Sequence, residues 1–155
     1  MPLQRKIRMG MVGGGQGAFI GAVHRIAAQI DSQIELVCGA FSSDPERAIA
    51  SGKELFLPEE RCYPDFTTMM AEEAKLPEGE RMDFVAIVTP NHVHFPAAKA
   101  ALEAGFHVLS DKPATLDKAE AIELEKLVTS TGLKYGLTHN YTGCLLYTSP
   151  SPRDA

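Results

Sequence analysis

A glycine-rich run near the start of the chain, GGGQG at 13–17, constrains the fold more than any other feature. It follows a short apolar run at 7–12 and precedes a segment at 18–28 with helical periodicity, a pattern that predicts strand, turn and helix. Glycine has no Cβ and readily adopts positive φ, so this backbone can turn tightly and approach a phosphate at the helix N-terminus. The turn therefore predicts a dinucleotide site, and a plain strand-to-helix junction is the alternative.

Composition excludes several classes of protein. The chain has 155 residues, 45% of them apolar and 23% charged, as expected for one soluble globular domain. A net charge of −5 without a basic cluster argues against a nucleic-acid surface. No apolar run approaches the roughly 20 residues that cross a membrane, and no secretory leader is evident. We therefore expect a cytoplasmic protein with no membrane or nucleic-acid partner, whose Cys38 and Cys62 are reduced structural thiols.

Apolar runs and helical segments alternate along the chain. Asp44 followed by Pro45 predicts one helix start and Asp65 another, while Cys62-Tyr63 suggests a short strand. Strands that read as continuous apolar runs between helices predict a doubly wound α/β fold, with a mainly parallel sheet covered on both faces. The expected strands are 7–12, 34–41, 83–88, 106–110 and 133–138, and the expected helices are 18–28, one from 45, 66–74, 95–104 and 116–130.

The segment 144–155 breaks this alternation with two prolines and no periodicity. Its residues resemble the translation of a transposase-type sequencing adapter, and an ordinary disordered tail is the alternative. We therefore expect one folded domain over 1–143, and we exclude 144–155 from it as unstructured.

Polar residues follow each predicted strand. In parallel α/β sheets, ligands bind beyond the carboxyl ends of the strands, so these residues should gather at one edge. Each group alone fits a simple turn or a solvated surface, but all of them together predict a binding site. Besides the glycine turn, they are Ser42, Ser43 and Asp44; Thr89, Pro90, Asn91, His92 and His94; Asp111 and Lys112; and His139, Asn140 and Tyr141.

Three stretches, 13–18, 89–94 with the helix after it, and 111–113, resemble the amino-terminal half of the Gfo/Idh/MocA oxidoreductases. This is the glucose-fructose oxidoreductase and inositol dehydrogenase family, and the resemblance covers about 5–143. Its most specific element is the Lys112-Pro113 pair, which the family usually precedes with Glu and this chain with Asp111. The resemblance implies a Rossmann domain that binds NAD or NADP, with Gly13, Gly15 and Ala18 at the three small-residue positions of the fingerprint.

The same resemblance implies a role for each residue of the edge. Lys112 would be the catalytic residue, contacting the nicotinamide ribose and the substrate hydroxyl and easing proton transfer. The expected cofactor-binding residues are Gly13, Gly15, Gln16, Gly17, Ala18, Ser42, Ser43, Arg47, Thr89, Pro90, Asn91, His94, Asp111, Lys112 and Asn140.

The residues after the second strand bear on the choice of cofactor. NAD-binding proteins usually place a carboxylate here for the ribose 2′-hydroxyl, and that carboxylate would repel a 2′-phosphate. This chain has Ser42-Ser43 with Arg47 nearby, which favours NADP. Asp44 would serve as the carboxylate if the register shifted by two residues, so NAD remains the alternative.

His92 and His94, together with His139 and Asp111, suggest a metal site as an alternative, because a His-x-His pair can chelate. Pro90 places both histidines in a turn that enters a helix, where chelating geometry is not assured. We therefore expect no metal, and we expect His94 to pack against the next helix.

The resemblance implies that the parent protein is a dehydrogenase of sugars, polyols or related hydroxyl compounds and forms a homo-oligomer. In that family a second, mainly β-sheet domain supplies much of the substrate site, including a histidine. We therefore expect this chain to bind cofactor weakly, to turn nothing over and to expose apolar surface. The alternative is a non-catalytic nucleotide-sensing module, which would have no need of Lys112.

Overall fold

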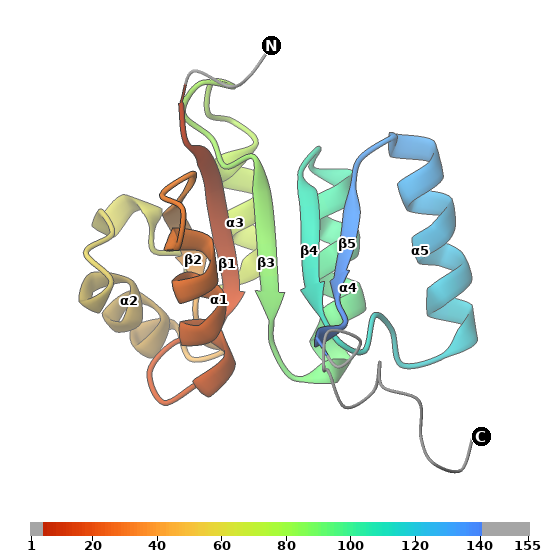
Figure 1. The fold of residues 1–155 in the computed structure, drawn as a ribbon, viewed down its shortest axis with the longest axis horizontal. Coiled ribbons are helices and arrows are strands. Elements are labelled where there is room, and N and C mark those ends of the chain that lie inside the picture. The colour runs from red at the N-terminus through yellow and green to blue at the C-terminus, as the bar shows by residue number, and fades with distance from the viewer. Residues whose placement is uncertain (1–4, 141–155) are drawn as a thin grey trace, which may run out of the picture.

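The computed structural model describes residues 5–140, which form a five-stranded sheet of order β2-β1-β3-β4-β5 (Figure 1). Every neighbouring pair of strands is parallel. The expected boundary at 143 and the tail at 144–155 lie outside the described residues. The strands are β1 (Ile7–Gly13), β2 (Ile34–Ala40), β3 (Phe84–Val88), β4 (His107–Asp111) and β5 (Tyr135–Thr138).

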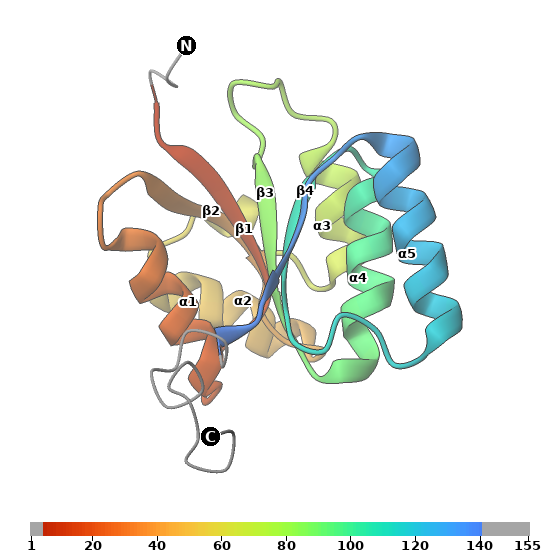
Figure 2. The same ribbon diagram turned by 45° about the vertical axis from the view of Figure 1, so that its right-hand side comes forward.

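Helices cover both faces of this sheet, which confirms the doubly wound α/β prediction. Figure 2 shows α3, α4 and α5 on one face, with α1 on the other and α2 beside the edge strand β2. Within residues 5–140, no helix has the length and apolarity needed to cross a membrane. The helices are α1 (Phe19–Gln29), α2 (Pro45–Glu54), the 3₁₀ turn η1 (Glu59–Arg61), α3 (Phe66–Glu73), α4 (Asn91–Glu103) and α5 (Lys118–Thr131).

The strand β3 shows why the strands read as unbroken apolar runs. Val85 and Ile87 pack into the core beneath α3, α4 and α5. Ala86 and Val88 belong to the opposite core, beneath α1. Because successive side chains of a strand point to opposite faces, a strand buried on both faces must be apolar at every position.

Aspartates define the starts of three helices. The carboxylates of Asp44, Asp65 and Asp117 each accept a hydrogen bond from the backbone N–H three residues further on, at 2.9, 2.8 and 2.9 Å. Such caps satisfy N–H groups that have no partner within the helix. The predicted starts at Asp44 and Asp65 are therefore confirmed.

Two boundaries differ from the sequence-based expectation. Helix α4 begins at Asn91 instead of about residue 95, and it contains Pro96. Pro96 lies past the first turn of the helix, so it removes one i to i−4 backbone hydrogen bond, the one to the His92 carbonyl. The short strand expected at Cys62-Tyr63 is reduced to an isolated bridge between Gly39 and Cys62 that follows η1.

A buried polar cluster, the Glu73 cluster, lies between η1, α3 and the start of β3. The Glu73 side chain is fully buried, and its carboxylate accepts hydrogen bonds from Arg61 at 2.7 and 2.8 Å. It also accepts one from the Tyr63 hydroxyl at 2.9 Å and one from the backbone N–H of Met82 at 3.0 Å. Burial, reinforced by the Glu73 carboxylate, raises the pKa of Tyr63. All four donors point inward, so this cluster is complete without any ligand.

Candidate cofactor-binding site

The predicted polar segments meet at one edge of the sheet. Since all strands are parallel, their carboxyl ends point the same way, and Gly13 at the end of β1 lies opposite Val88 at the end of β3. Asp111 at the end of β4 likewise lies opposite Thr138 at the end of β5. Tyr141 lies outside the described residues. We call this edge the cofactor rim.

The glycine turn of the rim has a backbone that only glycine fits. Gly13, Gly14 and Gly17 have φ of 82°, 73° and 77°. A Cβ on Gly13 would lie 2.8 Å from the Val88 carbonyl oxygen, and one on Gly14 would lie 2.8 Å from the Cα of Gly21. Both distances are too short for a side chain, so the turn brings bare backbone to the surface of the rim.

The helix that follows this turn has an open N-terminus. Ala18 is the N-cap of α1 and makes no side-chain cap hydrogen bond, and the first turn of the helix contains no acidic residue. The N–H groups of that turn are therefore available to an anion, and they lie beside a cleft of about 310 Å³. This cleft is lined by the turn and by Ala18, Phe41, Ser42, Ser43, Arg47, Val88, Thr89 and Pro90. The arrangement fits a dinucleotide pyrophosphate.

Three side chains from α1 and α2, which the sequence did not single out, hold the glycine turn through hydrogen bonds. Arg25 of α1 donates to the Gly14 carbonyl at 2.8 Å, and its burial lowers the pKa of the guanidinium. From α2, the Ser51 hydroxyl accepts from the Gln16 N–H at 3.1 Å, and Glu54 accepts from the Gln16 side chain at 2.5 Å. These residues belong to no recognisable motif, and only the packing of α1 and α2 brings them to the turn.

One end of the rim carries the residues expected at the cofactor ribose. The Asp44 carboxylate accepts from the Arg47 N–H at 2.9 Å, and the Ser42 hydroxyl accepts from the Asp44 N–H at 3.1 Å. The Arg47 guanidinium reaches over the glycine turn and donates to the Gln16 carbonyl. Asp44 thus acts as a helix cap, while Ser43 and Arg47 are exposed at the rim.

A buried hydroxyl without a partner lies in the middle of the rim. The Oγ1 of Thr89 has no hydrogen-bond partner among residues 5–140 and is shielded from solvent. Thr89 lines a second cleft, of about 400 Å³, together with Gly13, Ser42, Pro90 and His92. Because leaving a polar atom buried and unpaired is costly, this hydroxyl fits a polar group of a bound ligand. Asn91, the first residue of α4, is exposed nearby.

The other end of the rim carries Lys112. Its backbone N–H donates to the Asp111 carboxylate at 2.9 Å, and the Thr138 hydroxyl donates to the same oxygen at 3.1 Å. The side chain of Lys112 is exposed and makes no ion pair within the described part of the chain. Asp111 also lines an apolar cleft of about 340 Å³, whose polar members include Asn140 and His24. Burial lowers the pKa of His24, and the charge of Asp111 opposes this effect.

His94 lies beneath the rim. Its ring is buried, and its nitrogens lie 2.6 Å from the Pro113 carbonyl oxygen and 2.8 Å from that of Thr89. The ring therefore joins two loops of the rim and does not line either cleft there. Over residues 5–140, no group of three or more His, Cys, Asp or Glu side chains is placed to hold a metal ion.

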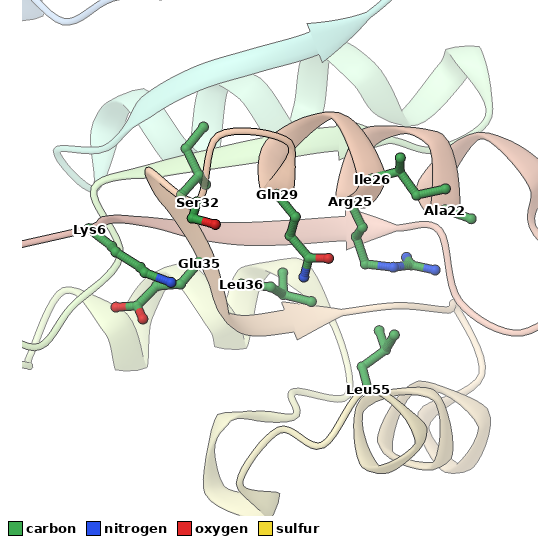
Figure 3. A pocket seen from close by; sticks show the side chains of 10 residues that line it. Lys6, Ala22, Arg25, Ile26, Gln29, Ser32, Glu35, Leu36 and Leu55 are labelled. Atoms are coloured by element: carbon green, nitrogen blue, oxygen red, sulfur yellow. The ribbon is translucent and has the colours of Figure 1, made fainter.

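A larger cleft, of about 660 Å³, lies between α1, β2 and α2 (Figure 3). Its polar lining includes Lys6, Ser32 and Glu35, which lie near the amino ends of β1 and β2, away from the rim. It lacks the glycine backbone, the open helix N-terminus and Lys112. Each cleft of the rim is smaller, but the rim combines all three features, and so it is the better candidate site.

Comparisons with known proteins agree with this geometry. A family model described as an oxidoreductase family with an NAD-binding Rossmann fold, Gfo/Idh/MocA, matches residues 7–139. An uncharacterised oxidoreductase, YfiI, of Bacillus subtilis is 42% identical over 142 residues, covering 91% of this chain and 36% of YfiI. The structure of an oxidoreductase from Sinorhizobium meliloti is 56% identical with a TM-score of 0.84, covering 90% of this chain and 38% of that one.

A third relative was solved with ligands. This inositol dehydrogenase homologue from Azotobacter vinelandii, in complex with NADH and myo-inositol, is 39% identical with a TM-score of 0.87. The match covers 94% of this chain and 38% of that protein. The chain thus spans little more than a third of the length of these relatives.

Proposed function

This chain belongs to the Gfo/Idh/MocA family of oxidoreductases with an NAD-binding Rossmann fold, and from that premise we propose the reaction it serves. It is the cofactor domain of a dehydrogenase that moves a hydride between a nicotinamide and a sugar, polyol or related hydroxyl compound. The observation that carries this proposal is the position of Lys112 at the same sheet edge as the glycine turn. The myo-inositol bound to the Azotobacter relative supports the class of substrate.

Each part of the rim has one task in this proposal. The N–H groups at the start of α1 bind the pyrophosphate, and the Thr89 hydroxyl binds a polar group of the cofactor. The bound nicotinamide supplies the hydride acceptor or donor. The ammonium of Lys112 donates a hydrogen bond to the substrate oxygen and assists transfer of its proton.

We propose NADP as the preferred cofactor. Ser42, Ser43 and Arg47 line the cleft next to the glycine turn and offer hydroxyl and guanidinium donors to a 2′-phosphate. The Asp44 carboxylate, which would disfavour that phosphate, already accepts the Arg47 N–H as a helix cap.

Fluorescence titration of the chain with NADPH and NADH tests this preference. We expect tighter binding of NADPH, and an Arg47→Ala variant should weaken NADPH by roughly tenfold and NADH by a smaller factor, because Arg47 also holds the Gln16 carbonyl of the glycine turn. Lys75→Ala is the matched control, because Lys75 pairs with Glu72 on α3, outside the rim. Tighter binding of NADH by the unmodified chain would reject the NADP preference. Absence of binding to either nucleotide would reject the cofactor role.

We further propose that residues 1–143 are one domain that binds cofactor without turning over substrate by itself. The length of the relatives supports this, since the chain matches 36% of YfiI and 38% of the Azotobacter protein. The exposed apolar residues Phe19 and Ile26 on α1, and Ile30 directly after it, also fit a surface that other parts of a longer protein cover. Incubation with NAD⁺ or NADP⁺ and myo-inositol should yield no reduced nicotinamide, and measurable turnover would contradict the proposal.

A further inference from the structure

Two loops of the rim are joined by a single buried side chain. His94 is 1% exposed, and its Nδ1 lies 2.6 Å from the carbonyl oxygen of Pro113. Its Nε2 lies 2.8 Å from the carbonyl oxygen of Thr89. Thr89 directly follows β3, and Pro113 directly follows Lys112 after β4. The ring therefore spans the gap between the ends of two neighbouring strands.

The chemistry of this contact is directional. A carbonyl oxygen only accepts hydrogen bonds, so a ring nitrogen must carry the proton in each bond. The neutral ring donates to one of the two loops, and the protonated ring donates to both. A ring that donates to both carbonyl oxygens fixes the distance between the loops through two hydrogen bonds, which an apolar side chain cannot make.

The backbone of Lys112 is held on its other side as well. Its N–H donates to Asp111 at 2.9 Å, and the Thr138 hydroxyl lies 3.1 Å from the same carboxylate oxygen and 3.0 Å from the Ser110 carbonyl oxygen. Lys112 thus lies between two anchors, Asp111 before it and the Pro113 carbonyl after it. Its own side chain is exposed and has no ion pair in the described range, so only its backbone is fixed.

We propose that His94 is the positioning residue for Lys112: it joins the Lys112-Pro113 loop to the Thr89 loop and so fixes the backbone from which the Lys112 side chain extends toward the cofactor. His94 itself contacts neither cofactor nor substrate in this arrangement. The inference rests on the proposed function for the role of Lys112, while the tie between the loops stands on the structure of this chain alone.

Amide hydrogen exchange of the cofactor-free chain tests the tie directly. A His94→Phe variant keeps a buried ring and loses the hydrogen-bonding ring nitrogens, so exchange at Lys112 should accelerate roughly tenfold. Exchange in β1 and β3 should stay unchanged, and His94→Gln, which retains a donor, should fall in between. His92→Phe is the matched control, because His92 is exposed on the same helix, two residues away. An unchanged rate at Lys112, or equal acceleration throughout the sheet, would overturn the proposal.

A double-mutant cycle on NADPH affinity then tests whether the His94 contacts between the two loops affect binding through Lys112. If they do, His94→Phe and Lys112→Ala should each weaken binding by a similar factor, and the double variant should be no weaker than either. Additive losses would overturn the positioning role. If the unmodified chain binds no nucleotide, the proposed function fails, and the exchange experiment still decides the tie.

Discussion

The Glu73 cluster and the cofactor rim are both polar, and they differ in whether their hydrogen bonds are complete. Around Glu73, a fully buried carboxylate meets four donors from Arg61, Tyr63 and Met82. At the rim, the Thr89 hydroxyl has no partner in the described residues, the start of α1 has no side-chain cap, and Lys112 is exposed. A complete cluster stabilises the fold, whereas an incomplete one is ready to receive a ligand. Mutations in the Glu73 cluster should therefore mainly lower stability, and mutations in the cofactor rim should mainly weaken nucleotide binding.

The largest effect on stability should come from Glu73→Gln. This change removes the charge that faces the Arg61 guanidinium inside the protein, and breaking a buried pair in this way costs about 3 to 5 kcal/mol. Urea denaturation measures it. The neighbouring Glu72→Gln, which breaks the exposed pair with Lys75, is the control and should cost less than about 1 kcal/mol. Equal costs would show that the cluster is not a stability element.

Gly13→Ala should damage both function and fold, because Gly13 belongs to β1 and to the rim. With φ of 82° and a Cβ only 2.8 Å from the Val88 carbonyl oxygen, alanine strains the turn and should cost about 1 to 3 kcal/mol. Nucleotide binding should be lost in the titration described above. Gly79→Ala serves as the control, since a Cβ there meets no atom within 4 Å. Retained binding in Gly13→Ala would argue against the predicted phosphate site.

The Glu73 cluster should also respond to alkaline pH. Burial and the Glu73 carboxylate raise the pKa of Tyr63, so its contribution to stability is complete below the unfolded pKa of about 10. That contribution is lost as pH rises through the higher, folded pKa. Tyr63→Phe should cost about 1 kcal/mol at neutral pH and should flatten the alkaline decline. Denaturation curves above pH 9 that decline identically in both proteins would contradict this assignment.

The smallest change in stability should come from Lys112→Ala. The side chain is exposed and unpaired within residues 5–140, so the free energy of unfolding should shift by less than about 0.5 kcal/mol. Nucleotide affinity should nevertheless fall. A loss of more than about 1 kcal/mol would place Lys112 among the structural residues instead.

Sequence patterns predicted the parts of the molecule that depend on neighbouring residues. The apolar runs at β1 to β5 and the caps at Asp44 and Asp65 are local signals, and the structure confirms them. The order of polar residues after each strand was also enough to predict that they meet at one sheet edge.

The features that the sequence did not predict depend on contacts between segments that are distant in the chain. Arg25 and Ser51 hold the glycine turn from two helices, and no local pattern marks them. The His94 ring joins two loops that are close only in the folded sheet, and no local pattern predicted these two contacts. The start of α4 was misplaced because Pro90 and Asn91 suggest a turn, whereas Pro90 is the N-cap and Asn91 the first residue of the helix.

The order of the strands also governs when the glycine turn can form during synthesis. The strand β1 leaves the ribosome first, yet it lies between β2 and β3, and Gly13 pairs with Val88. The strand β1 cannot pair early with an adjacent strand in a hairpin, because every pairing in the sheet is parallel and spans a helical crossover. Such long-range pairing slows folding. The first residues of the nucleotide site to be translated therefore stay exposed to chaperones and proteases until β3 has emerged.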